Sequence, residues 1–398
     1  MKPIRKNLSE RQLTFKEIFR NIKETFPFES KKEFLKFKSL YEKYYSEIKN
    51  LPENDRDFFS HIEQFLASLK NSHTKLGNYP GKMFFKPKGY SVLFLNKRFY
   101  LRRGTKIIGE ILNINDEEPI EILNFIIRKI SSSTKQYLIY RALMFLLADR
   151  DGKPVRIKVK NFDGETRVIH LRREKIIYKL FKKIVETKLL SKQLGYIKIS
   201  AWNGEETQSL LDKKIDYFIK NKIKALIIDV RGNDGGNSNI AKHLASHLFN
   251  KKVLFSITKF RISKRDFRLK RSLNNVESTK PYLNVPIILL IDAACFSSNE
   301  YFISGLKDNN KRAYLIGETT GGGSGNPKKF VIPYKESSFE LLISTWQYYR
   351  PNKAPLEGKG IKPHLVVRPI LKDFIIRHDR VLEVAIKKAT HLGFESKF

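Results

Sequence analysis

Ser297 lies where an apolar strand ends and a helix is expected to begin, in the segment 295–301 (CFSSNEY). The amides of a first helical turn favour negative charge, so a serine there is placed like the nucleophile of a strand–turn–helix elbow. Taken alone, the residues favour another interpretation, in which Ser297 caps the helix and Glu300 completes a capping box. Ser298 is an alternative nucleophile that the spacing to Glu300 disfavours. Cys295 is expected to be a small buried packing residue.

A serine nucleophile needs a general base, and the sequence offers His73 between Ser72 and Thr74, at the end of a predicted helix. Taken alone, a histidine after a helix is usually a surface or capping residue. His73 and Ser297 are far apart in the chain, so only folding can bring them together.

Glycine-rich turns follow two of the predicted strands. The first, 229–237, contains Gly235 and Gly236, which could let backbone N–H groups point at an anion. A plain tight turn explains it equally well, and the absence of Gly-Lys-Ser/Thr excludes a Walker-type phosphate loop. The second turn is 317–325, and a turn-rich stretch containing Glu357 comes later. Surface loops are the simpler interpretation of both.

His243 and His247 are four residues apart on a predicted helix, a spacing found in metal-binding pairs. No glutamate lies between them and no third ligand is evident, so we expect no metal. The single cysteine excludes an internal disulfide and a multi-cysteine zinc site. No cofactor is expected.

The elements that must position these residues divide the 398-residue chain into four parts. Apolar residues at three- and four-residue spacing predict a helical domain over 1–84. Short strands around two helices predict a small β-rich domain over 85–172. Strands alternating with helices predict an α/β core with largely parallel central strands over 173–372, with the site at the strand C-terminal ends. An amphipathic helix is expected within 373–398.

Together, these motifs resemble in order and content the C-terminal-processing and tricorn-core family of serine peptidases, the tail-specific proteases. The resemblance extends over nearly the whole chain. The residues that carry it are Ser72, His73 and Thr74; Arg231, Asn233, Gly235 and Gly236; Ser297 and Glu300; Gly317, Glu318 and Thr320; and 357–363.

The resemblance implies an α/β catalytic core of the crotonase-like, ClpP-like β/α superhelix type. It also implies an N-terminal helical domain that carries Ser72 and His73, and a PDZ-like domain over 85–172. Processing-type members have a lysine base after the Gly-Glu-x-Thr loop, but here 321–323 are glycines. The tricorn-type branch, with a histidine base, therefore fits better.

In the arrangement that the resemblance implies, Ser297 attacks a peptide carbonyl and His73 acts as general base. Ser72 and Glu357 orient His73 through hydrogen bonds. Backbone amides hold the oxyanion, namely those of Gly236 or Gly235 and of Ser298.

The formal net charge is +36, from 77 Lys and Arg against 41 Asp and Glu. Such a surface attracts polyanions, yet the basic residues are spread along the chain. Their densest stretch, 251–271, is interpreted as a solvated lysine-rich surface, without a zinc finger or RNP-type motif. A nucleic-acid-associated protein is therefore the third hypothesis. A peptidase acting on peptides or unfolded proteins comes first, and a catalytically inactive peptide-binding member of the same fold comes second.

No signal peptide is visible, and the longest apolar run, 285–291, is far shorter than the roughly 20 residues of a membrane span. The sequence therefore predicts a cytoplasmic protein with no membrane span and no specific nucleic-acid partner. Export is kept as an alternative, and a homo-oligomer is left open.

Overall fold

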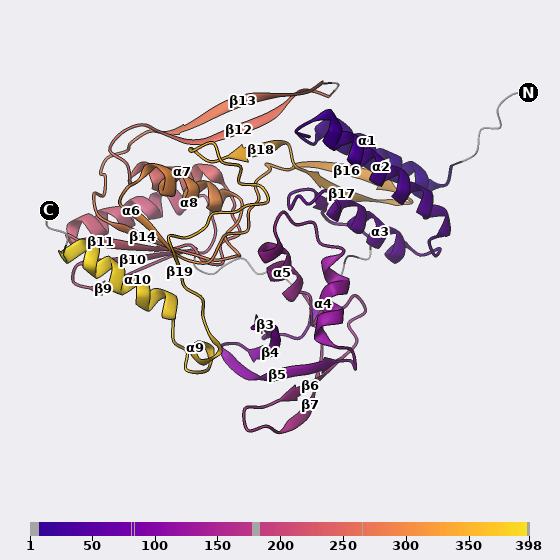
Figure 1. Ribbon diagram of the computed structural model, residues 1–398, viewed down its shortest axis with the longest axis horizontal. Coiled ribbons are helices and arrows are strands. Elements are labelled where there is room, and N and C mark those ends of the chain that lie inside the picture. The colour runs from indigo at the N-terminus through magenta and orange to yellow at the C-terminus, as the bar shows by residue number, and fades with distance from the viewer. Residues whose placement is uncertain (1–7, 81, 83, 177–183, 265, 396–398) are drawn as a thin grey trace, which may run out of the picture.

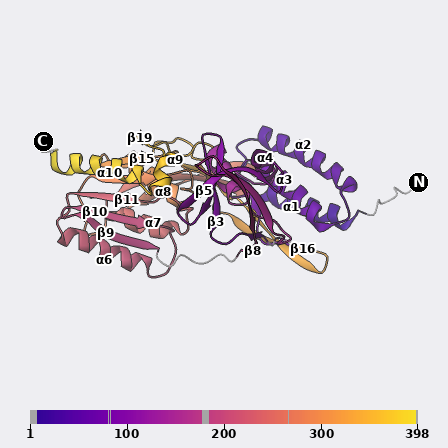
Figure 2. The same ribbon diagram turned by 90° about the horizontal axis from the view of Figure 1, so that it is seen from below.

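The computed structural model describes residues 8–80, 82, 84–176, 184–264 and 266–395 (Figure 1). The N-terminal helices lie at one end of the molecule and an α/β layer lies at the other. In Figure 1 the antiparallel sheet of the middle part lies below both, and Figure 2 shows it from that side. None of the described helices is long and apolar enough to cross a membrane.

The N-terminal part is helical, as the sequence predicts. Its helices are α1 (Glu10–Thr25), α2 (Lys31–Glu47) and α3 (Asp55–Ala67). Each begins at a polar cap, because the side chains of Ser9, Ser30 and Asn54 accept hydrogen bonds from backbone N–H groups three residues on. The chain leaves α3 through the segment that contains His73 and enters β1 (Lys75–Leu76).

The core of this helical part includes a hairpin from far along the chain. Strands β16 (Lys328–Tyr334) and β17 (Ser337–Ile343) pair with each other, and β17 pairs with β1. Phe339 of the hairpin packs against Phe59 of α3, with ring centroids 5.3 Å apart. The core therefore crosses the predicted boundary at residue 84, and the hairpin ties the His73 segment to the C-terminal half.

The middle part is a five-stranded antiparallel sheet in the order β3-β4-β5-β6-β7. The strands are β3 (Tyr90–Leu95), β4 (Arg98–Arg103), β5 (Lys106–Ile114), β6 (Val155–Lys160) and β7 (Thr166–Leu171). Helices α4 (Pro119–Ile127) and α5 (Lys135–Leu143) lie between β5 and β6 in sequence. Val155, Ile157 and Val159 are buried while their neighbours on β6 are exposed, so this sheet covers a core of its own.

The α/β part is built on a six-stranded sheet in the order β19-β15-β14-β11-β10-β9. The strands are β9 (Val185–Ser191), β10 (Leu194–Ile199), β11 (Ala225–Asp229), β14 (Ile287–Ile291), β15 (Ala313–Gly317) and β19 (Leu365–Val366). All neighbours are parallel except β9 and β10. The predicted, largely parallel arrangement is therefore confirmed.

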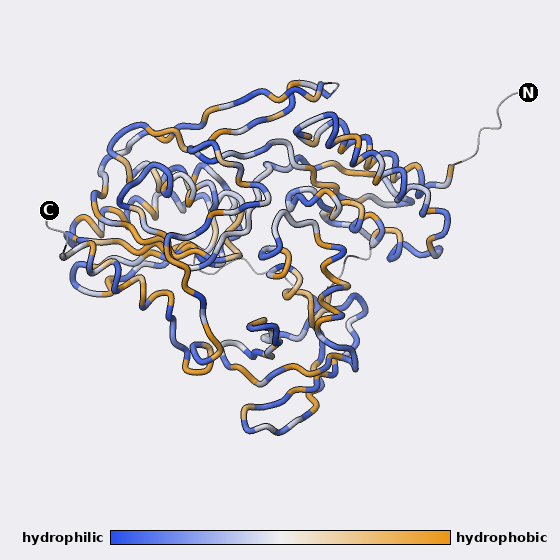
Figure 3. The backbone as a smooth tube through the Cα atoms, viewed as in Figure 1, coloured by the Kyte–Doolittle hydropathy of each residue, from blue (hydrophilic) through white to orange (hydrophobic). Residues whose placement is uncertain are grey.

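Helices cover both faces of this sheet, which explains why every residue of β11 and β14 is buried. Helices α6 (Thr207–Lys220), α7 (Ser238–Ser246) and α8 (Ser298–Asn309) share one core with the sheet, and α10 (Arg380–Thr390) shares the other. Figure 3 shows the hydrophobic segments gathered in these central strands. The glycine-rich turn 229–237 begins at the end of β11, and the segment that contains Ser297 follows β14.

The basic stretch 251–271 belongs to a β-hairpin, which was not predicted. Strands β12 (Val253–Ser263) and β13 (Asp266–Val276) pair along their length, and β18 (Trp346–Tyr349) adds a third strand. Phe255 on β12 is fully buried, whereas the described basic side chains of β12 and β13 are half-buried or exposed. The lysine-rich surface expected for 251–271 is thus the exposed side of the sheet that β12, β13 and β18 form.

Candidate active site

Ser297 sits on a strained turn between β14 and α8. Its φ of 57° and ψ of −124° lie in a region that non-glycine residues adopt at a cost of roughly 1–3 kcal/mol. Asp292 holds the turn by accepting hydrogen bonds from the N–H groups of Ala294 and Cys295, at 3.0 and 3.1 Å. The Ser297 side chain makes no capping hydrogen bond. The helix-cap interpretation is therefore wrong, and the elbow geometry is present.

His73 reaches this elbow from a segment 224 residues earlier. Its Nε2 lies 3.1 Å from Ser297 Oγ, within hydrogen-bond reach. The backbone of His73 is held by Asn71, whose Oδ1 accepts from the His73 N–H at 3.2 Å. The imidazole stacks on Phe296, with centroids 4.8 Å apart and planes at 16°. Folding thus brings together the two residues that the sequence singled out separately.

Burial controls the protonation of His73. The residue is 8% exposed, and desolvation, with a smaller contribution from the Lys75 charge, lowers its pKa to about 3. The imidazole is therefore neutral at ordinary pH. A neutral imidazole can accept a proton, which is what a general base must do.

The expected hydrogen bonds from Ser72 and Glu357 to His73 are not formed. Among the described residues, the buried Nδ1 of His73 has no hydrogen-bond partner. Ser72 Oγ instead accepts from the Ser133 N–H at 2.8 Å and pairs with Ser133 Oγ at 2.9 Å. Ser133 Oγ in turn donates to Glu357. The hydroxyl of Ser72 is occupied by this neighbour and does not reach the imidazole.

Glu357 nevertheless lies close to His73 along the hydrogen-bond network. Its Oε1 accepts from Asn71 Nδ2 at 3.1 Å, and its Oε2 accepts from the Ser324 N–H at 3.0 Å. Burial raises its pKa to about 7, against the opposing effect of the Ser133 and Ser324 donors. The carboxyl group therefore acts on the His73 backbone through Asn71.

The turn before α7 brings two glycines against the elbow. A Cβ on Gly235 would stand 2.8 Å from the Cβ of Ser297, and a Cβ on Gly236 would stand 2.4 Å from the Trp202 carbonyl oxygen. Their φ values of 112° and 134° also favour glycine. The Gly235 N–H donates to Asn233 Oδ1 at 2.9 Å and is thereby occupied.

Two amides near Ser297 remain available to a ligand. Among the described residues, the N–H groups of Gly236 and Ser298 have no hydrogen-bond acceptor. Ser298 Oγ donates to the Gly236 carbonyl oxygen at 2.6 Å, which holds the glycine turn and the helix start together. The same bond occupies the Ser298 hydroxyl, so Ser297 is the serine that faces His73.

Glu300, one helical turn after Ser297, fixes the second glycine-rich loop. Its buried carboxylate accepts from Thr320 Oγ1 and from the N–H groups of Gly322 and Gly323, at 2.8 and 2.9 Å for the amides. Burial raises its pKa to about 8, and the three donors oppose that rise. The Gly323 carbonyl accepts from the Ser297 N–H at 3.1 Å, so this loop supports the elbow.

Cys295 packs as predicted. It is fully buried, and its Sγ donates to the Val230 carbonyl oxygen at 3.1 Å. Burial raises the pKa of the thiol well above its ordinary value. The thiol therefore stays protonated at neutral pH and is a poor nucleophile.

Four residues around His73 were not predicted: Asn71, Ser133, Tyr137 and Phe296. The Tyr137 ring stacks on Phe296 at 4.2 Å, and Phe296 stacks on His73, so three rings form one stack. Of the four, only Asn71 could have been found from the sequence, because an asparagine after a helix favours a turn in which its side chain binds the backbone two residues on. The other three could not, because they lie far from His73 in the chain or because their role depends on side-chain orientation.

A cavity of about 1160 Å³ lies beside this stack, between α3, β1 and the middle part. Ser72 and Tyr137 line it, and both also contact the His73 surroundings described above. Basic side chains outnumber acidic ones in its lining, with Lys75 and Arg141 among them.

Comparison with known proteins finds a family match that contains Ser297 but not His73. The model for Peptidase family S41 matches residues 193–367. The chain is 25% identical to carboxyl-terminal-processing peptidase 2, chloroplastic, of Arabidopsis thaliana, over 61% of this chain and 45% of that protein. It is 27% identical to the carboxy-terminal processing protease CtpB of Bacillus subtilis, over 46% and 36%. The chain thus spans less than half the length of these curated relatives.

Solved structures show the same fold. Mature CPAF has a TM-score of 0.81 at 14% identity, covering 98% of both chains. The photosystem II D1 C-terminal processing protease has a TM-score of 0.54 at 16% identity, covering 93% of this chain and 97% of that one. The family match contains Ser297 and both glycine turns, whereas His73 lies before it. Residues 193–367 are therefore similar to peptidase family S41.

Proposed function

We propose that this protein is a serine peptidase in which Ser297 is the nucleophile and His73 the general base. The observation that carries the proposal is the 3.1 Å separation of His73 Nε2 and Ser297 Oγ at a strained elbow. Support also comes from the peptidase family match and from relatives named as carboxy-terminal processing proteases.

In the proposed reaction, Ser297 Oγ attacks a peptide carbonyl while its proton passes to His73 Nε2. The amides of Gly236 and Ser298 donate hydrogen bonds to the carbonyl oxygen as negative charge develops on it. His73 then gives its proton to the leaving amine, and an acyl ester remains on Ser297. Water, deprotonated by His73, hydrolyses the ester and restores the free serine.

The proposed substrate is a peptide or an unfolded protein chain. The cavity of about 1160 Å³ has room for several residues of an extended chain and reaches the His73 surroundings through Ser72 and Tyr137. Lys75 and Arg141 in its lining favour acidic segments by charge.

One observation favours a second candidate, the catalytically inactive peptide-binding member of the same fold. The His73 Nδ1 has no partner among the described residues, whereas a working base is usually oriented through that atom. Against this candidate, the Asn71 bond and the Phe296 stack hold the His73 backbone and ring, and its Nε2 already lies at reacting distance.

The finer structural expectations belong to the same proposal. We propose that the α/β part is crotonase-like and that the five-stranded part is PDZ-like, since each has the strand and helix content that the resemblance implies. The four-part domain division, a cytoplasmic location and a homo-oligomer stay predictions.

The test is cleavage of a reduced, unfolded protein, followed by mass spectrometry of the fragments. Wild type is expected to cut, while Ser297→Ala and His73→Ala are not. Ser209→Ala, an exposed serine on α6, is the matched control and is expected to cut like wild type. A fluorophosphonate reagent should label Ser297 in the wild type. If peptides bind but wild type neither cuts nor reacts, the inactive binding protein is the correct assignment.

A further inference from the structure

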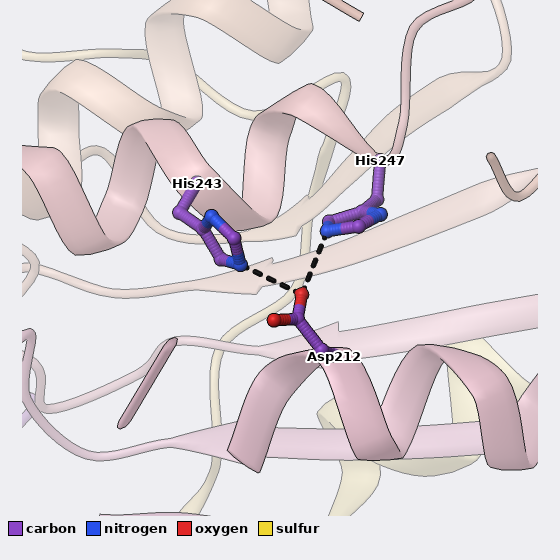
Figure 4. Close-up of side chains that lie close together, drawn as sticks. All are labelled: Asp212, His243 and His247. Carbon is purple, nitrogen blue, oxygen red and sulfur yellow. Dashed lines mark hydrogen bonds and ion pairs between the residues drawn. The ribbon is translucent and has the colours of Figure 1, made fainter. Parts of the chain in front are cut away.

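Two histidines and an aspartate meet on neighbouring helices, outside the candidate active site (Figure 4). Asp212 is on α6, His243 is on α7, and His247 follows the last turn of α7. Asp212 Oδ1 lies 2.7 Å from His243 Nε2 and 2.9 Å from His247 Nε2. All three ligand atoms lie within 4.8 Å of one another.

The hydrogen bond at the far side of His247 determines what its Nε2 can do. His247 Nδ1 lies 2.8 Å from the Pro281 carbonyl oxygen, which can only accept, so Nδ1 carries a hydrogen. In the neutral ring the Nε2 then presents a lone pair, and it faces the carboxylate of Asp212, which is also an acceptor. Two acceptors at 2.9 Å need a cation between them, either a proton or a metal ion.

His247 is held in the orientation that a metal ligand needs. Its side chain is only 3% exposed. A metal-bound histidine usually donates its other N–H to a carbonyl or carboxylate, which orients the ring. The bond to Pro281 is of that kind.

We propose that Asp212, His243 and His247 bind one divalent ion of the Zn²⁺ type, with water completing a tetrahedral site. Two imidazole nitrogens and one carboxylate oxygen suit zinc, at bond lengths of about 2.0–2.2 Å. Ligand atoms of such a site stand about 3.3 Å apart, as those bond lengths require, so Asp212 must move outward by a few tenths of an ångström. Its side chain is 44% exposed and that of His243 is 26% exposed, which leaves room for this movement and for ion entry.

The ion would connect α6 to the C-terminal end of α7. The N-terminal end of α7 follows Gly236, which supplies a proposed oxyanion amide. No ligand of the ion is a residue of the proposed catalytic group. The site therefore strengthens the helix layer that carries the glycine turn and takes no part in the chemical step.

The test uses the full chain, freed of metal by a chelator and then titrated with Zn²⁺ or Co²⁺. One equivalent should bind, and Zn²⁺ should raise the unfolding temperature by several degrees. Co²⁺ should give the visible absorption of a tetrahedral nitrogen–oxygen site. These readouts do not depend on peptidase activity.

Variants locate the site. His243→Ala and Asp212→Asn should each lower Zn²⁺ affinity by about 10- to 100-fold, as the loss of a metal ligand or of its partner does. Both side chains are partly exposed, so the variants should fold, and circular dichroism checks this. His170→Ala, an exposed histidine on β7, is the control and should bind like wild type. The proposal fails if wild type shows no stoichiometric binding, or if the two variants keep the full shift in unfolding temperature.

Discussion

His73 and Glu357 are joined through the side chain of Asn71 and not by a direct hydrogen bond. Asn71 Nδ2 donates to the Glu357 carboxylate at 3.1 Å, and Asn71 Oδ1 accepts from the His73 N–H at 3.2 Å. The acid therefore fixes the position of the base through its backbone, while Phe296 supports the ring. Variants of Glu357 and variants of His73 should therefore affect the reaction differently.

Removing either member of the reacting pair should abolish most of the rate. Ser297→Ala or His73→Ala should each lower kcat by about 10⁴- to 10⁶-fold, because the two act as one unit. The double variant should be no slower than the worse single variant. Initial rates on a peptide taken from the cleavage map measure this. Additive losses would mean that the two residues do not act together.

Glu357→Gln should slow the reaction without weakening substrate binding. Both carboxylate oxygens of Glu357 accept from donors, whereas the amide group of glutamine would turn an N–H toward at least one of them. Asn71 would then lose its support and His73 would move. We expect kcat to fall about 10- to 100-fold, in line with other residues that orient a reacting group, with KM nearly unchanged. A raised KM with normal kcat would instead place Glu357 in substrate binding.

The pH profile should follow Glu357 and not His73. The His73 pKa of about 3 keeps the base neutral from pH 5 upward, so no loss is expected near the ordinary histidine value. The Glu357 pKa of about 7 means that its carboxyl is protonated below pH 7 and then accepts fewer hydrogen bonds. Wild-type kcat should therefore rise between pH 6 and 8, and Glu357→Gln should be flat there. A rise that persists in the variant would exclude Glu357 as its source.

The parts of the site that the sequence reveals are those set by local geometry. Ser297 and the glycine turns follow buried strands, so their places at the strand ends could be predicted. The link from Asn71 to Glu357 could not be predicted, because it depends on how side chains from distant segments are oriented. Asp212 was missed as the third partner of the two histidines because it lies 31 residues before His243, on another helix.

The fold shows the same limit. The parallel sheet was predicted because β11 and β14 are short runs that are apolar except for Asp229 at the end of β11. The β12–β13 hairpin was missed because basic residues interrupt its apolar pattern and its pairing contains irregularities at two places. The packing of β16 and β17 on the N-terminal helices joins residues hundreds of positions apart, which no local pattern reports.

Gly236→Ala should damage both stability and catalysis. The φ of 134° and the 2.4 Å approach to the Trp202 carbonyl leave no place for a methyl group, so the turn and its amide must shift. Gly164→Ala is the matched control, because Gly164 also has a positive φ, 89°, but open space around it. Both variants should lose about 1 kcal/mol or more of unfolding free energy from backbone strain. Gly236→Ala alone should lose about 10²- to 10³-fold in kcat, as removal of one oxyanion donor does.

Glu300 should make the protein less stable as the pH rises from 7 to 8. Its folded-state pKa of about 8 is above the ordinary value of 4.5, so over this range the folded state holds a proton that the unfolded state has lost. Unfolding free energy then falls with rising pH, by at most about 1.4 kcal/mol per pH unit for one group. Above pH 8 this contribution levels off. Glu357, with a pKa of about 7, adds a smaller fall over the same range as it loses its remaining proton, whereas His73, with a pKa of about 3, changes little.

Urea unfolding of wild type and Glu300→Gln at pH 7 and pH 8 measures the effect. Glutamine at position 300 should remove most of the slope between the two pH values, because it does not titrate. It should also cost about 1–3 kcal/mol at both, since an amide cannot accept from all three donors of the loop. Glu336→Gln, at an exposed position, is the control and should leave both the stability and its slope unchanged. An equal slope in wild type and Glu300→Gln would show that Glu300 is ionised throughout, held by its three donors.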